Sequence, residues 1–214
     1  EVIRTFLFNE KPDVLWFMTD PRFYVWLWEM ENEIRQHIPM VYYHVWDNYP
    51  YPTYNTDYYK SNDCVCTISK VTDDIVRTLA PEVDCVHIPH TVDTSVFKKQ
   101  DTEVLEKVKK ANNLQDKFTF FWNNRNARRK QSGTLIFWFK EFLDKATLIM
   151  HTEPDDPHGQ DLIAILEELG LSSGEVQLST NKMPPEELAL MYNLADCTIN
   201  ISDAEGFGLA TLES

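Results

Sequence analysis

The sequence predicts an α/β protein in which parallel strands alternate with helices. Short apolar runs and amphipathic segments follow one another along the whole 214-residue chain. Several of the apolar runs are continuous, which is typical of strands covered on both faces of a sheet. Alternation on this scale indicates parallel sheets, so the expected fold class is α/β.

The predicted strands are the short apolar runs Val14–Met18, Met40–His44, Cys64–Ile68, Cys85–Ile88, Phe118–Trp122, Thr147–His151, Val176–Ser179 and Cys197–Ile201. The predicted helices lie between them, at Tyr24–Gln36, Thr72–Leu79, Thr102–Asn112, Ser132–Asp144, Asp161–Leu169 and Pro185–Leu194. Two prolines followed by Glu186 and Glu187 favour a helix start for the last of these.

The segment His90–Phe97 (HTVDTSVF) suits a hinge, because it follows a strand and precedes a long charged helix. We therefore expect two α/β domains, at residues 1–96 and 97–214. The first has four predicted strands but no glycine-rich phosphate turn, and the chain stops at Ser214 inside a helix begun at Gly206. Both ends are thus expected to be truncated, and the first domain to be incomplete.

Composition excludes several classes of function. The net charge of -14 argues against nonspecific binding to nucleic acid or anionic lipid, which requires clustered Lys and Arg. No apolar run approaches the length of a transmembrane helix, and residues 1–16 lack the features of a signal peptide. The cysteines lack the paired spacing of a zinc site. We interpret them as buried free thiols in a reducing compartment, the cytoplasm; they are Cys64, Cys66, Cys85 and Cys197.

The first candidate site is FFWNNRNARRKQSG, residues 120–133. Cations follow the end of the predicted strand and precede the next helix; they are Arg125, Arg128, Arg129 and Lys130. Ligands of open α/β sheets bind beyond the carboxyl ends of the strands, where guanidinium groups and free helix amides can hold phosphate oxygens. The charge pattern alone fits an anion site and a solvated basic loop equally well.

The second candidate site is SDAEGFGLATLES, residues 202–214. Gly206 and Gly208 allow close approach of the backbone to a ligand at a helix start. Glu205 lies at the strand tip, and Glu213 lies about one turn inside the helix, where its carboxylate can accept hydrogen bonds from a diol. Taken alone, the pattern also fits a helix start with an acidic first turn.

Together these residues resemble glycosyltransferase family 4. EGFGLATLE is similar to the E-x7-E motif of that family, and Arg125 and Lys130 match its R-x4-K pair. IPHTVDTSVF resembles the segment between the two domains of that family. PPEELALMYNLADCTINIS resembles the segment that precedes the E-x7-E motif, and PMVYYHVWD resembles a first-domain strand that ends in histidine. The likeness spans residues 40–214 in order and spacing. It departs at Asn124, where a glycine is usual, and at Thr91, where the hinge usually has glycine.

The resemblance implies a GT-B fold, with two Rossmann-like domains facing a cleft. It implies transfer of a sugar from a nucleoside diphosphate to a carbohydrate or other hydroxyl acceptor, with retention of anomeric configuration. Arg125 and Lys130 would stabilise the departing diphosphate. His44 and Glu205 would bind the donor sugar, and Glu213 the ribose. The rest of the implied donor site is the loop Gly206, Phe207, Gly208 and Leu209. The resemblance implies that no cofactor or metal ion is needed, and the sequence agrees, since no D-x-D follows a strand.

Other readings remain open. A dehydrogenase would need G-x-G-x-x-G after a strand, and the sequence has none. A non-catalytic nucleotide-binding fragment, or a sugar-nucleotide epimerase of the same two-domain plan, are the alternatives. A histidine that caps a strand end is as good an interpretation of His44 as a sugar ligand. For Trp46, Trp122 and Tyr192, core packing is favoured over stacking on a base or sugar.

Overall fold

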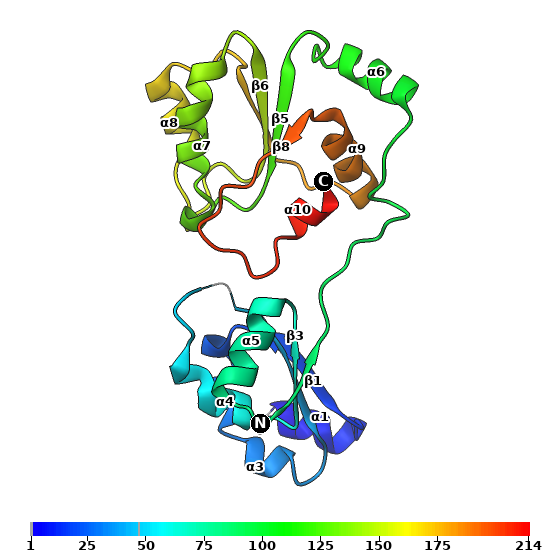
Figure 1. Ribbon diagram of the computed structural model, residues 1–214, viewed down its shortest axis with the longest axis vertical. Helices are drawn as coiled ribbons and strands as arrows, with labels where there is room; N and C mark the ends of the chain where they lie inside the picture. Colours follow the sequence, from blue (N-terminus) through cyan, green and yellow to red (C-terminus); the bar gives the residue numbers. More distant parts are fainter. Residues whose placement is uncertain (1, 47) are drawn as a thin grey trace. The chain divides into compact units, whose positions relative to one another are not determined.

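The computed structural model describes residues 2–46 and 48–214, and the chain divides into two compact units. One comprises Glu1–His90 with Glu205–Phe207, and the other comprises Thr91–Ala204 with Gly208–Ser214. Among the described residues, each unit holds one four-stranded sheet whose neighbouring strands are all parallel (Figure 1). The α/β class with parallel sheets is therefore confirmed. The domain boundary after residue 96 stays a prediction.

The first unit has the strand order β1-β2-β3-β4. Its strands are β1 (Leu15–Thr19), β2 (Met40–His44), β3 (Cys64–Thr67) and β4 (Asp84–His87). Its helices are α1 (Val2–Glu10), α2 (Val25–Trp28), α3 (Glu31–Ile34), α4 (Thr56–Lys60) and α5 (Lys70–Leu79), with 3-10 turns η1 (Pro21–Phe23) and η2 (Thr53–Asn55). Side chains alternate between the two faces along each strand, so the register decides which residues share a face.

One face of this sheet carries the core of the first unit. Phe17, Tyr42 and Val65 are in register on adjacent strands and pack with buried residues of the helices that follow them. The ring centroids of Phe17 and Tyr42 lie 5.4 Å apart, and burial of such rings contributes much of the core energy. On the opposite face Trp16 and Met18 are about half exposed. Tyr43 and Cys66 on that same face are buried, so this sheet is covered on one face and partly covered on the other.

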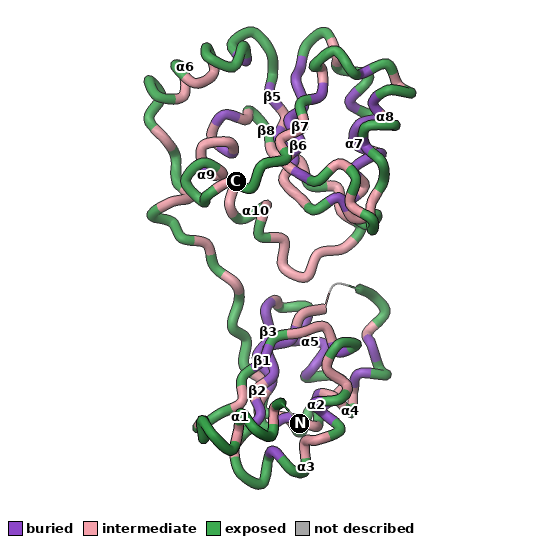
Figure 2. Tube along the Cα trace, turned by 180° about the vertical axis from the view of Figure 1, so that it is seen from behind, coloured by how far each residue is buried: buried purple, intermediate pink, exposed green. Residues whose placement is uncertain are grey.

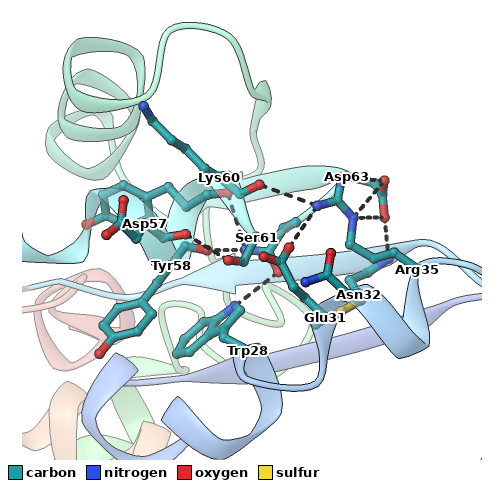
Figure 3. A network of polar contacts seen from close by, with 12 residues as sticks. Trp28, Glu31, Asn32, Arg35, Asp57, Tyr58, Lys60, Ser61 and Asp63 are labelled. Atoms are coloured by element: carbon teal, nitrogen blue, oxygen red, sulfur yellow. Dashed lines mark hydrogen bonds and ion pairs between the residues drawn. The ribbon is translucent and has the colours of Figure 1, made fainter.

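A polar network ties α3 to the amino ends of two strands (Figure 3). Arg35 Nη2 donates to Asp63 Oδ1 at 3.0 Å and Arg35 Nη1 donates to Glu31 Oε2 at 2.9 Å. The other carboxylate oxygen of Asp63 accepts from the backbone N–H of Met40 at 2.8 Å. Asp63 precedes β3 and Met40 begins β2, so the network lies at the edge opposite to the carboxyl ends. We interpret it as structural.

The second unit has the strand order β7-β6-β5-β8. Its strands are β5 (Phe118–Asn123), β6 (Ala146–His151), β7 (Val176–Ser179) and β8 (Cys197–Thr198). Its helices are α6 (Thr102–Ala111), α7 (Ser132–Phe139), α8 (Leu162–Leu169), α9 (Pro185–Leu194) and α10 (Leu209–Glu213), with 3-10 turns η3 (Arg128–Lys130) and η4 (Lys140–Phe142).

Both faces of this second sheet are covered. Trp122 and Met150 pack with residues of α7 and α8, whereas Phe121 and Ile149 pack with Tyr192 of α9. Figure 1 shows α7 and α8 on one face and α6 and α9 on the other, and Figure 2 shows buried residues along β5 and β6. Continuous apolar runs are what such two-sided burial requires. Here the prediction from the sequence is confirmed.

Each predicted strand is present among the described residues, although the strand expected at Cys197–Ile201 is limited to Cys197–Thr198. The helices differ more. The predicted helix Tyr24–Gln36 is broken into α2 and α3 at Met30, whose backbone is not helical. Helix α5 begins two residues early because Ser69 and Thr72 form a capping box before and within its first turn. Helices α1 and α4 were not predicted, and α7 ends at Phe139 rather than near residue 144.

Two further expectations are corrected. The last helix begins at Leu209 rather than Gly206, because Gly208 takes the left-handed conformation (φ 85°) and caps it. The cysteines are free thiols, but Cys66 is buried, Cys64 and Cys85 are partly buried, and Cys197 is exposed on the short strand β8. Burial raises the pKa of the Cys85 thiol to about 11. No helix of the described residues is long and apolar enough to cross a membrane.

Candidate functional site

The loops that follow β5 and β8 leave the same edge of the second sheet. β5 and β8 pair in parallel, with Phe120 opposite Cys197 and Phe121 opposite Thr198. Their carboxyl ends therefore point in one direction, as predicted for the segments that carry Arg125 and Glu205. The edge of an open parallel sheet is the usual place for a ligand.

Hydrogen bonds join the two loops directly. The backbone N–H of Asp203 donates to the carbonyl of Arg129 at 2.8 Å, and Arg129 Nη1 donates to the carbonyl of Ala204 at 2.6 Å. The Gln131 side-chain amide also donates to the Asp203 carboxylate, at 2.8 and 3.0 Å. The two segments singled out in the sequence thus form one continuous surface of the second unit up to residue 204.

A third loop, residues 152–161 after β6, packs against the first of these. Asn126 is fully buried, and its Nδ2 donates to the carbonyls of Pro154 (3.1 Å) and Gln160 (2.6 Å). Its Oδ1 accepts from the hydroxyl of Ser132 at 2.7 Å. A Cβ at Gly159 would overlap the Asn126 carbonyl, so the approach of the two loops requires glycine there. Sequence reasoning did not assign this loop to the site.

Arg125 projects from the β5 loop and is held by Asp156 of the β6 loop. Arg125 Nε donates to Asp156 Oδ2 at 2.6 Å, and Arg125 Nη2 donates to Asp156 Oδ1 at 3.1 Å. The Arg125 side chain is 60% exposed, whereas that of Asp156 is 8% exposed. Hydrogen bonding to the Arg125 guanidinium lowers the pKa of Asp156, so the carboxylate is ionised at neutral pH. Arg125, which the sequence predicts to bind phosphate, is therefore an exposed cation whose guanidinium is held by the Asp156 carboxylate.

The other cations of this loop differ in exposure. Arg128 and Arg129 are exposed, whereas Lys130 is only 6% exposed. Lys130 ends η3, and Gln131 follows in the left-handed conformation (φ 58°) as the residue before α7. Lys130 thus lies just before a helix, as expected from the sequence. Its side chain, however, is largely covered by protein.

Glu213 belongs to a chain of three hydrogen-bonded side chains. Asn123 Nδ2, at the end of β5, donates to the hydroxyl of Tyr192 at 2.8 Å. That hydroxyl donates to Glu213 Oε2 at 2.9 Å. Asn123 lies two residues after Phe121 and so faces α9, where Tyr192 lies. Burial, with the nearby Glu213 carboxylate, raises the pKa of Tyr192 and keeps its proton in place for the bond.

The remaining residues of the second candidate segment lie between β8 and α10. Gly208 and Leu209 belong to the second unit, and Leu209 opens α10 with a 40% exposed side chain. Glu205, Gly206 and Phe207 are partly buried and group with the first unit. The structure does not bring these three residues into the second unit with Arg125 and Glu213, and their role stays a prediction.

His44 lies in the core of the first unit. It is two residues after Tyr42 on β2 and therefore faces the same buried side of the sheet. Its Nδ1 lies 3.0 Å from the hydroxyl of Tyr42, and its Nε2 lies 3.1 Å from that of Tyr59. Because the Tyr42 hydroxyl donates its proton to the Thr19 carbonyl, we infer that Nδ1 carries the imidazole proton and Nε2 accepts.

Burial therefore determines the charge of His44. Desolvation lowers its pKa to about 3, although the carboxylate of Asp20 acts in the opposite direction. With both ring nitrogens bonded to tyrosines, the ring offers no nitrogen to a ligand in this structure. Its contact with a donor sugar stays a prediction. The alternation of faces along β2 was the signal in the sequence that pointed to burial.

The described residues contain no group of three or more His, Cys, Asp or Glu side chains placed to hold a metal ion. The positive charge at the candidate edge comes from the arginines and Lys130 of residues 125–130. This edge therefore carries guanidinium groups and the backbone amides of its loops. Both are suitable donors for phosphate oxygens.

Solved structures with the same fold exist. No protein-family model and no curated protein matches the chain. HepE of Anabaena, solved with UDP and glucose, is 16% identical over 99% of this chain and 59% of its own, with a TM-score of 0.78. Sucrose-phosphate synthase of Thermosynechococcus elongatus is 16% identical over 99% of this chain and 55% of its own, with a TM-score of 0.74.

A third similar structure is the α,α-trehalose 6-phosphate synthase of Burkholderia multivorans, 11% identical over 94% of this chain and 53% of its own, with a TM-score of 0.69. The chain shares the α/β fold of these three structures over 94–99% of its length. At these identities the likeness is one of fold. The chain spans somewhat more than half the length of the structures that it matches.

Proposed function

We propose that the chain is part of a glycosyltransferase that uses a nucleoside-diphosphate sugar, and that its second unit binds the donor. The observation that carries the proposal is the parallel pairing of β5 with β8. It brings the loop of Arg125 and the segment before Glu213 to one edge of a sheet. The similar fold of HepE, which was solved with UDP, supports a donor of this class.

The proposed chemistry is loss of the diphosphate from the anomeric carbon and transfer of the sugar to an acceptor hydroxyl. Negative charge grows on the diphosphate as that bond breaks. Arg125, Lys130 and the amides near Gly208 and Leu209 would stabilise this charge, an electrostatic effect that is usually a large part of catalysis. These groups would do so without a metal ion.

Glu213 would accept hydrogen bonds from the two ribose hydroxyls, and Glu205 would bind the sugar. The spacing of these glutamates, and that of Arg125 and Lys130, matches glycosyltransferase family 4 and favours retention of configuration. The acceptor would be a carbohydrate or another hydroxyl compound.

Titration calorimetry with UDP, GDP and ADP, each beside its nucleoside, tests the proposal. We expect one of the three diphosphates to bind. Arg125→Ala should weaken binding of that diphosphate about tenfold or more, because charge-assisted hydrogen bonds are lost. Binding of the matching nucleoside should change little. Transfer from the matching sugar nucleotide then distinguishes an enzyme from a non-catalytic binding protein. Absence of binding by all three diphosphates, or equal losses for diphosphate and nucleoside, would contradict the donor site.

A further inference from the structure

The two side chains of the Arg125–Asp156 ion pair differ strongly in how far they are exposed. The carboxylate is almost wholly covered, at 8% exposure, whereas the guanidinium that it binds is 60% exposed. Most exposed ion pairs hold two mobile side chains and contribute little. Here one partner is fixed by the protein, and the other extends from it toward solvent.

Asp156 is fixed by its own loop. Its Oδ1 accepts from the backbone N–H of His158 at 2.8 Å, and its backbone carbonyl accepts from the N–H of Gly159 at 2.8 Å. The loop is in turn bound to the β5 segment, where the N–H of Arg128 donates to the His158 carbonyl at 3.2 Å. Gln160 Oε1 accepts from the N–H of Gly133 in the first turn of α7 at 2.9 Å. The carboxylate therefore has a defined place relative to β5 and α7.

The geometry leaves part of the guanidinium for a ligand. A guanidinium has five N–H groups, and Asp156 accepts from Nε and from one N–H of Nη2. Arg125 makes no other hydrogen bond to the described residues. One N–H on Nη2 and both on Nη1 remain, and the end of the guanidinium that carries both terminal nitrogens can form a second fork onto two oxygens.

We propose that Asp156 is a positioning residue of the donor site, which holds Arg125 so that this second fork faces the diphosphate. The inference rests on the proposed function, and it names a residue that the motifs in the sequence do not include. A carboxylate next to an anion site would by charge alone weaken diphosphate binding. If Asp156 acts by positioning Arg125, loss of its carboxylate should weaken diphosphate binding. If it acts by charge alone, the same change should strengthen diphosphate binding.

Asp156→Asn separates the two effects, because it keeps the shape of the side chain and removes the charge. The matched control is Asp155→Asn, the same change one residue away at an exposed side chain. We expect Asp156→Asn to weaken the diphosphate that the wild type binds (UDP, GDP or ADP) about tenfold, by releasing Arg125. We expect Asp155→Asn to leave binding unchanged or slightly tighter, and neither change to affect the nucleoside.

A double-mutant cycle excludes a merely structural role. In the Arg125→Ala background, Asp156→Asn should have no further effect on diphosphate binding, since there is no guanidinium left to position. The Nε–H signal of Arg125 in nitrogen-15 spectra, assigned by its loss in Arg125→Ala, gives a second readout without nucleotide. Asp156→Asn should speed its exchange with water, and Asp155→Asn should not.

The outcomes separate this inference from the proposed function. If Arg125→Ala leaves diphosphate binding unchanged, the assignment of the donor site is wrong. If Arg125→Ala weakens binding but Asp156→Asn leaves it unchanged or tightens it, Asp156 does not position Arg125. An equal loss from Asp156→Asn with and without Arg125 would also overturn the inference, because the effect would then come from the loop itself.

Discussion

The hydroxyl of Tyr192 in α9 donates a hydrogen bond of 2.9 Å to Glu213 Oε2 in α10. The same hydroxyl accepts from Asn123 at the end of β5, so three elements meet at one oxygen atom. Tyr192 is 6% exposed and its ring packs on Phe121, with centroids 5.1 Å apart. One oxygen of the Glu213 carboxylate is thus oriented from the core of the second unit.

Tyr192→Phe removes this hydroxyl and keeps the ring. If Tyr192 orients Glu213 for ribose, the affinity for the bound ribonucleoside diphosphate should fall about three- to tenfold, which is the scale of the net contribution of one ordinary hydrogen bond. The 2′-deoxy nucleotide should be affected less. Tyr54→Phe, at a 72% exposed tyrosine, is the control. A Tyr192 variant with unchanged affinity would remove the case for orientation.

Glu213→Gln tests the ribose contact itself. A carboxylate accepts from both hydroxyls, whereas an amide has one acceptor and a misplaced donor. Binding of the ribonucleotide should fall about tenfold, and the 2′-deoxy and 3′-deoxy forms should lose less. Glu186→Gln makes the same charge change at an exposed residue of α9 and should have little effect. Equal losses for ribo- and deoxynucleotides would disprove the ribose assignment.

Acid stability should depend on Asp73 in the first unit. Arg77 Nε donates to both of its oxygens at 3.0 Å, and Lys70 donates at 3.0 Å. Hydrogen bonding to Arg77 is the main cause that lowers the pKa of Asp73 to about 2. A carboxyl whose pKa is lower in the folded state stabilises above its unfolded pKa near 4, and that stability is lost as the pH falls toward 2.

The expected loss from Asp73 is about 1–2 kcal/mol between pH 4 and pH 2. Urea unfolding at several pH values measures it. Asp73→Asn should lower the free energy of unfolding at pH 6 and flatten its fall below pH 4. Asp74→Asn, at a 48% exposed carboxylate that also pairs with Lys70, should change the profile much less. Identical profiles for the two variants would show that the Asp73 cluster is not the cause.

His44 should give a pH dependence in a different range. Its pKa is about 3 in the folded chain because of burial, against 6.5 when exposed. As the pH falls, His44 is therefore protonated in the unfolded chain before it is protonated in the folded chain. The free energy of unfolding should fall as the pH drops below 6.5, by up to about 1.4 kcal/mol per pH unit. Imidazole NMR should show His44 still neutral at pH 5. A His44 that titrates near pH 6.5 would contradict the buried, doubly bonded ring.

Much of the fold was predictable because burial leaves a pattern in the sequence. Runs such as Phe118–Trp122 are continuous where both faces of the sheet are covered, and the parallel edge of β5 and β8 followed from their alternation with helices. The break at Met30 was not predicted, because the apolar period continues through it while the backbone does not. Trp28 before the break and Ile34 after it are both buried in the core of the first unit.

The site was predictable only in part. Arg125 and Glu213 were found from their spacing within motifs, but their partners lie 31 and 21 residues away along the chain. An aspartate after a strand is common in loops, so nothing in the sequence distinguished Asp156 from Asp155. Their difference is burial of the side chain, which depends on contacts between two loops. For His44 the histidine at a strand end was noticed, but the face to which it points was not considered.

The claim that the edge of the second sheet binds a nucleoside diphosphate is tested most directly by mapping the bound nucleotide. Amide NMR spectra recorded during titration with UDP, GDP or ADP would report each backbone group. We expect the largest shifts in residues 124–131, in residues 203–204 and at Gly208 and Leu209. Shifts confined to the amino ends of the strands, or to the first unit, would contradict the assignment.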